Sequence, residues 1–142
     1  MVDLSKLKEI NEELNTCLGD ITTYPDTQTV NYMVEGGKCI GFNLHHCDDV
    51  AIQRAHMEKD TFFPRHSHDA IEYLIQISGK AKLTIYSNGD IEKEVDMTRG
   101  KCFRIPENKS HSYKAITSSW MLGITIPAVD EYPGIREGEC CD

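Results

Sequence analysis

The sequence predicts an all-β domain, a sandwich or barrel built from eight or nine short antiparallel strands. Two observations predict this fold class. Runs of four to eight apolar and β-branched residues recur along most of the chain, and Gly, Asn and Pro residues separate them. The length of 142 residues fits a single domain with a sizeable hydrophobic core.

The chain is expected to divide into three parts. Residues 1–28 are predicted to form a short N-terminal α-helix and a linker, because apolar residues recur at helical spacing from Leu4 to Leu18 and Gly19 follows as a cap. Residues 29–127 are predicted to form the barrel. Residues 128–142 are polar and rich in Gly and Pro, which favours a C-terminal tail that wraps loosely around the domain.

Turn residues place the strands of the barrel. Gly36-Gly37 and Asn88-Gly89 each separate two apolar runs, as in a β-hairpin, and a tight turn is expected at Gly79. Strands are predicted at residues 30–34, 39–44, 50–57, 71–77, 80–86, 91–95, 102–105, 111–116 and 120–126.

Three residues at the centre of the chain suggest a metal site. His66 and His68 are two residues apart, and Glu72 follows four residues later. If this stretch is one extended strand, residues of equal parity share a face, so all three side chains point the same way. Imidazole and carboxylate ligands suit divalent first-row metals. The alternative is two surface histidines beside a solvated glutamate.

This stretch resembles the first half of the cupin signature, G-x5-H-x-H-x3,4-E-x6-G. The positions of His66, His68, Glu72 and Gly79 match that pattern in type and spacing, whereas Asp60 replaces the leading glycine. Asp is readily accommodated in turns, so this departure is mild.

The stretch from Gly100 to His111 resembles the second half of the signature, G-x5-P-x-G-x2-H-x3-N. Gly100, Pro106 and His111 match, Asn108 replaces the inner glycine, and Ala115 replaces the final asparagine. Asn tolerates positive φ better than other residues with a side chain. The final asparagine is not a metal ligand in the family pattern, so all four ligand positions are filled.

The resemblance implies a double-stranded β-helix, or jelly-roll barrel, with one divalent metal ion per chain. The ligands would be His66, His68, Glu72 and His111, and Fe, Mn, Ni, Co and Zn all remain open. A barrel wall that includes Leu74, Ile105 and Tyr113 would surround them.

The resemblance also implies a metal-dependent enzyme of the dioxygenase, lyase, decarboxylase or isomerase type, acting on a small organic acid or an enol-type substrate. The alternative is a non-catalytic cupin that binds or senses a small molecule through its metal. Sequence spacing identifies no general acid or base, so the catalytic residues remain unknown, and fold alone does not choose the chemistry.

Other chemistry-bearing residues are expected to be structural. The run His45–Asp49 is predicted to be a polar turn, Cys102 a small buried apolar residue, and Cys140 and Cys141 free thiols on the tail. His56 is also expected to be structural. Arg54, Arg104 and Trp120 are candidate cavity residues that the sequence does not rank.

Composition restricts the partners. The net charge of −8 and the pI of about 5.2 argue against nucleic acid and anionic membrane surfaces. Six cysteines without a secretion signal are typical of reduced thiols, which predicts a cytoplasmic protein.

Alternate residues of the strand 71–77 form a second apolar face, as do those of strand 120–126. These faces predict a homodimer, which the resemblance to cupins also implies. The other expected partner is a small-molecule ligand or substrate.

Overall fold

The computed structural model describes residues 29–128 and 135–136, and strands account for most of them. The strands are β1 (Thr29–Asn31), β2 (Cys39–His46), β3 (Ala51–Met57), β4 (Phe62–Ser67), β5 (Ile71–Ser78), β6 (Ala81–Ser87), β7 (Asp90–Met97), β8 (Cys102–Ile105), β9 (His111–Ala115), β10 (Ser119–Ile126) and β11 (Ile135–Arg136). The predicted N-terminal helix lies outside the described residues, as do Cys140 and Cys141. Part of the predicted tail forms the short strand β11.

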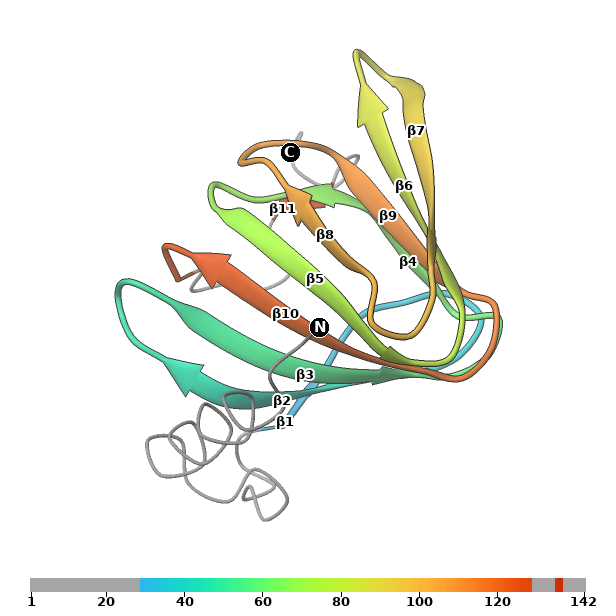
Figure 1. Cartoon of the computed structure of the whole chain (residues 1–142), viewed down its shortest axis with the longest axis horizontal. Coiled ribbons are helices and arrows are strands. Elements are labelled where there is room, and N and C mark those ends of the chain that lie inside the picture. The colour runs from blue at the N-terminus through green and yellow to red at the C-terminus, as the bar shows by residue number, and fades with distance from the viewer. Residues whose placement is uncertain (1–28, 129–134, 137–142) are drawn as a thin grey trace, which may run out of the picture.

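The strands form two antiparallel sheets that face each other. The six-stranded sheet has the order β1-β2-β3-β10-β5-β8, and the five-stranded sheet has the order β11-β4-β9-β6-β7. Figure 1 shows that the sheets converge at one end and spread apart at the other. This arrangement is a jelly-roll barrel, so the predicted all-β fold class is confirmed.

Alternation along the strands separates the interior of the barrel from its surface. In β5, Glu72, Leu74 and Gln76 are buried, whereas the odd-numbered residues between them are only partly buried. In β10, Met121 and Thr125 are buried, whereas Trp120 and Leu122 lie on the outer face. The two-residue period therefore places the core as the sequence predicts.

The first strand is shorter than predicted, because the chain turns away from the first sheet. β1 pairs with β2 only as far as Asn31, and the peptide N–H of Tyr32 then donates to the Cys39 carbonyl over 3.0 Å. Glu35 instead exchanges two backbone hydrogen bonds with Phe62 of β4, at 2.9 and 2.8 Å. The segment from Thr29 to Glu35 thus passes from the edge of one sheet to the other (Figure 1).

Two glycines permit this crossing. Gly36 has a φ of +78°, which residues with a Cβ rarely adopt. A Cβ at Gly37 would clash with Oγ1 of Thr61, so only glycine fits against this segment. The pair Gly36-Gly37 is therefore more than the hairpin turn that the sequence predicts, because it packs the crossing segment against the start of β4.

The residues that replace glycines of the cupin signature adopt glycine-like conformations. Asp60 has a φ of +65° and Asn108 a φ of +59°. The interpretation of both as tolerated turn residues is confirmed. Asn88, with a φ of +52°, and Gly89, with a φ of +85°, form the predicted hairpin between β6 and β7.

Two predictions about individual residues are wrong. Cys102 is exposed, because it lies on the outward side of the edge strand β8, where Ile105 takes the buried position. His45 and His46 belong to the end of β2 and are not part of a turn. The turn starts at Cys47, whose N–H donates to the Val50 carbonyl over 3.0 Å.

The outer strand of the five-stranded sheet, β7, is strongly charged. Its first seven residues include Asp90, Glu92, Lys93, Glu94 and Asp96, all exposed. No helix within the described part of the chain is long and apolar enough to cross a membrane.

Candidate metal centre

Three buried histidines meet at the spread end of the barrel. His66 lies near the end of β4, His68 follows β4 directly, and His111 is the first residue of β9. His66 and His111 are opposite each other in the antiparallel pairing of β4 with β9. Their relative accessibilities are 4, 5 and 2% for His66, His68 and His111, so the whole cluster is shielded from solvent.

The sequence argument that one strand carries His66, His68 and Glu72 is wrong in its geometry. β4 ends at Ser67, and β5 begins at Ile71 in the opposite sheet. Glu72 therefore points inward from the six-stranded sheet, whereas His66 points inward from the five-stranded sheet. The residues share the interior because the sheets face each other. The register of β4 against β9 is also irregular between Phe63 and His66, which interrupts the simple alternation.

The imidazole rings are close enough to share one ion. The ring centroids of His66 and His111 are 4.2 Å apart, those of His68 and His111 are 5.2 Å apart, and those of His66 and His68 are 5.9 Å apart. One ring nitrogen from each histidine lies within 4.8 Å of the corresponding nitrogen of the other two. Three nitrogen donors are therefore grouped closely enough to hold a single metal ion.

Main-chain carbonyls fix the orientation of all three rings. Nδ1 of His66 lies 2.8 Å from the Pro64 oxygen, and Nδ1 of His111 lies 2.8 Å from the Lys109 oxygen. Nδ1 of His68 lies 3.3 Å from the Ala70 oxygen. Because a carbonyl only accepts, each Nδ1 must carry the proton, and the lone pair of the neutral ring is then on Nε2. This pattern is common among metal-binding histidines.

Glu72 adds a buried carboxylate to the cluster. Its Oε2 is 3.0 Å from Nε2 of His68, and its relative accessibility is 2%. Burial alone would raise the pKa of Glu72, but the hydrogen bond from His68 and the nearby histidines lower it to about 2. The carboxylate is therefore ionised at neutral pH.

The histidines differ in how readily they take up a proton. Burial and the proximity of His111 lower the pKa of His66 to about 3, so His66 is neutral over the ordinary pH range. Burial would also lower the pKa of His68, but the hydrogen bond to Glu72 and the charge of that carboxylate outweigh burial and raise it above 6.5. In the absence of a metal ion, His68 is the proton-bearing partner of Glu72.

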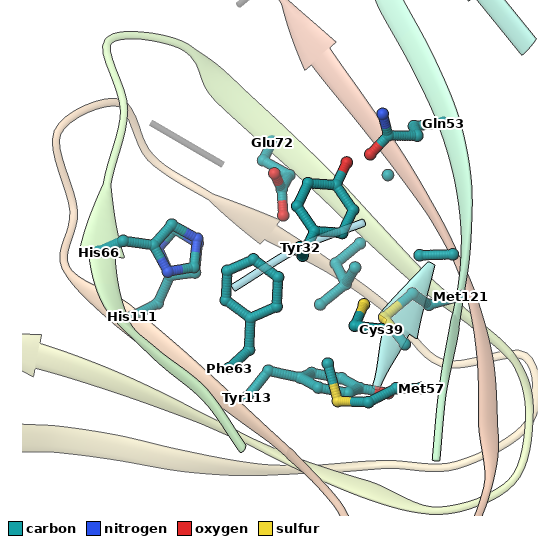
Figure 2. A pocket seen from close by; sticks show the side chains of 13 residues that line it. Tyr32, Cys39, Gln53, Met57, Phe63, His66, Glu72, His111, Tyr113 and Met121 are labelled. Atoms are coloured by element: carbon teal, nitrogen blue, oxygen red, sulfur yellow. The ribbon is translucent and has the colours of Figure 1, made fainter. Parts of the chain in front are cut away.

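A cavity adjoins the cluster and runs into the barrel, with an empty volume of about 480 Å³ including its open mouth. Figure 2 shows side chains from both sheets around it. The lining is mostly apolar and aromatic, with His66, Glu72 and His111 on its wall. The other lining residues are Tyr32, Cys39, Gln53, Ala55, Met57, Phe63, Leu74, Tyr113, Met121 and Gly123.

The sequence anticipates only part of this lining. Leu74 and Tyr113 line the cavity as predicted, whereas Ile105 is buried in the core and is not in the lining. The candidates Arg54 and Trp120 stack on each other outside the barrel, with the guanidinium carbon 4.8 Å from the ring centroid. Arg104 is exposed on β8.

His56 lies on the same outer face of the sheet and does not line the cavity, which agrees with the expectation of a structural role. Its ring is 4.7 Å from that of Trp120, and its Nε2 is 2.8 Å from Oγ of Ser118.

The residues that sequence reasoning misses lie on β2, β3, β4 and β10 and on the crossing segment. Gln53, Ala55 and Met57 have equal parity on β3, and their pairing partners on β10 are Gly123, Met121 and Ser119. The alternation of β3 and β10 could have identified these positions as inward-facing. The inward position of Tyr32 depends on the crossing, for which the local sequence contains no signal.

Comparison with known proteins agrees with this geometry. A family model described as cupin domain matches residues 53–126, more than half of the chain. No curated protein matches this sequence.

Solved structures of low sequence identity share the fold. An RmlC-like cupin from Shewanella frigidimarina superposes with a TM-score of 0.60 at 18% identity, covering 75% of this chain and 90% of that chain. KdgF from Halomonas sp. superposes with a TM-score of 0.62 at 15% identity, covering 75% of this chain and 95% of that chain.

Oxalate decarboxylase from Bacillus subtilis is a longer neighbour. It superposes with a TM-score of 0.64 at 18% identity over 78% of this chain, but over only 30% of its own length. At these identities the structural neighbours establish the fold alone. The family match, the jelly-roll barrel and the position of the three histidines together show that the chain belongs to the cupin family.

Proposed function

We propose that this protein binds one divalent metal ion through His66, His68, His111 and Glu72. We further propose that it uses the ion to act on a small organic acid or enol-type molecule. One observation carries the proposal. Three buried imidazoles, each oriented by a backbone carbonyl, lie with a buried carboxylate beside a cavity that opens into the barrel.

The donor set fits a divalent cation. An ionised carboxylate is costly to bury unless a positive charge compensates for it, and Glu72 is almost fully buried. His66 offers a neutral imidazole, because its pKa is lowered to about 3. Neutral imidazole and carboxylate are the forms in which these residues ligate Fe, Mn, Ni, Co or Zn. One of the structural neighbours, an oxalate decarboxylase from Bacillus subtilis, is described with Mn(II) centres.

The residues around the cluster would exclude water from a reaction at the ion. When bound, a divalent ion would supply a Lewis acid that polarises an oxygen of the ligand. Glu72 would hold a fixed negative charge at the ion and is not proposed as a general base. Phe63 and Leu74 form an apolar wall, and the Phe63 ring is 4.9 Å from that of His66. This wall would keep the reacting end of the ligand dry and strengthen the electrostatics there.

One observation favours a second function, in which the metal centre binds or senses a small molecule without turnover. Apart from the proposed ligands, the ionisable groups that the described part of the chain contributes to the lining are Tyr32, Cys39 and Tyr113. Burial raises the pKa of Cys39 to about 12 and that of Tyr113 to about 12, and it also raises the pKa of Tyr32. These groups remain protonated at neutral pH, so none is a ready general base.

Removing one ligand should abolish most of the metal binding. The purified protein should contain about one divalent ion per chain by elemental mass spectrometry. His66→Ala and His111→Ala should each weaken binding at least about tenfold, because a nitrogen donor is lost. His56→Ala is the matched control, since this histidine lies outside the barrel. If both ligand variants retain metal as the parent does, the site assignment is wrong.

Metal affinity should decrease as the pH falls below about 7, because a proton competes for His68. The pKa of His68 is raised above 6.5 and that of His66 is lowered to about 3, so of these two only His68 takes up a proton in this range. Competition titrations against a chelator measure the metal affinity at each pH. In the acidic range the affinity of the parent should fall by up to about tenfold more per pH unit than that of His68→Asn, because the variant has no proton to lose at this position. Equal slopes in parent and variant would contradict this assignment.

Turnover, and its loss in Glu72→Gln, would distinguish an enzyme from a binding protein. We expect a metal-loaded sample to turn over a small carboxylate or diketone, detected in a screen that includes oxygen uptake. Glu72→Gln should lose that turnover while circular dichroism shows an intact fold. Measurements of water proton relaxation on Mn(II)-loaded protein should show exchangeable water at the ion. Ligand binding without turnover of any compound would favour the second function.

The protein is also proposed to be a cytoplasmic homodimer. Its described cysteines, Cys39, Cys47 and Cys102, are free thiols, which fits a reducing compartment. The outer face of the six-stranded sheet is apolar across β5 and β10, and the guanidinium carbon of Arg54 lies 5.3 and 4.8 Å from the ring centroids of Phe42 and Trp120. Arg and Trp are the residue types enriched at interface hot spots. A second copy of the chain would cover this face.

Charges placed on this face should separate the two copies. Ile77 and Ile126 are 41 and 45% exposed, and Ile77→Lys with Ile126→Lys should convert a dimer into a monomer in light scattering at micromolar concentration. Ile91→Lys is the matched control, because Ile91 is 60% exposed on the other sheet, in β7. A monomeric mass for the parent protein would reject the dimer.

A further inference from the structure

Tyr32 extends from the crossing segment into the cavity beside the three histidines. It lies between Asn31, the last residue of β1, and Glu35, which pairs with β4. Its relative accessibility is only 7%, and it lines the same cavity as His66, Glu72 and His111. Figure 2 shows the ring within the cavity, between Glu72 and Gln53 in this view. Tyr32 is therefore part of the wall that a bound molecule would meet.

Gly41 on the neighbouring strand β2 leaves space for this ring, because glycine has no side chain. A Cβ at Gly41 would lie 2.6 Å from Cε2 and 2.9 Å from the hydroxyl oxygen of Tyr32, closer than real Cβ contacts. The same Cβ would lie 3.1 Å from Cδ of Gln53. The hydroxyl end of the ring is thus seated over Gly41 and beside Gln53.

The other side of the ring is held by aromatic packing. The centroids of Tyr32 and Phe63 are 5.5 Å apart, with an angle of 57° between the ring planes. Phe63 in turn packs against the imidazole of His66. Tyr32 is also anchored at its backbone by the hydrogen bond to Cys39, so the ring has a defined position.

We propose that Tyr32, seated in the notch at Gly41, limits the length of the ligand that the metal site accepts. The inference rests on the proposed function and specifies its substrate class as compact chelating molecules. A ligand that binds the ion and carries a long chain would have to displace the ring. Tyr32 and Gly41 both lie outside residues 53–126, so this limit belongs to a part of the chain that the family match does not cover.

Two chelators with the same head group test the size limit. Acetohydroxamate and octanohydroxamate would be titrated into Co(II)-loaded protein, and binding followed by the visible absorption of the ion and by calorimetry. The parent should bind acetohydroxamate at least about tenfold more tightly than octanohydroxamate. In Tyr32→Ala this preference should disappear through tighter binding of the longer chelator, because the ring no longer blocks its chain.

Two further variants separate the ring from its hydroxyl and from its contribution to folding. Tyr32→Phe keeps the ring and should retain the preference of the parent. Tyr32→Leu keeps an apolar side chain in the core, so it serves if the alanine variant does not fold, and it should also bind octanohydroxamate more tightly. Thermal unfolding of each metal-loaded variant provides a control for the fold.

The outcomes distinguish this inference from the function on which it rests. Equal binding of the two chelators by the parent would overturn the size limit and leave the proposed function standing. An unchanged preference in both Tyr32→Ala and Tyr32→Leu would have the same meaning. If neither chelator binds to the metal-loaded parent or to these variants, the ion is not accessible, and both the inference and the proposed function fail.

Discussion

Three hydrogen bonds from imidazole N–H groups to backbone carbonyls determine which ring nitrogens this centre can offer to a metal ion. Each histidine donates from Nδ1 to a carbonyl two residues away in the chain, which precedes His66 and His111 but follows His68. The acceptors are the carbonyls of Pro64 within β4 and of Ala70 and Lys109 outside the strands, and therefore the backbone rather than other side chains fixes the tautomer. The barrel then needs only to bring two strands and one turn together for the Nε2 atoms to converge.

The fold could be predicted from the sequence because its signals are local. Apolar runs of strand length lie directly beside turn signals such as Gly36-Gly37 and Asn88-Gly89. Most predicted strands agree with those observed to within one or two residues. The boundary of β1 could not be predicted in this way. It depends on pairing between Glu35 and Phe62, which are far apart in the sequence, and local propensity contains no record of such a contact.

The candidate metal residues could be named from the motif, but the argument from strand parity gave the wrong reason. His66 and Glu72 share the interior although they lie on opposite sheets, because the chain changes sheets between them. Tyr32 shows the complementary limit. Its place in the cavity results from a crossing and from the absence of a side chain at Gly41, and neither follows from the type of residue at position 32.

The charged strand β7 affects how the protein meets copies of itself. An open sheet edge exposes unpaired N–H and C=O groups, which can template the addition of a strand from another molecule. At this edge, carboxylates and lysine at Asp90, Glu92, Lys93 and Glu94 would be brought close to those of an approaching strand and would have to lose their hydration. The barrel therefore resists growth by continuous sheet extension there, which protects a chain rich in β-strands from forming fibrils through this edge.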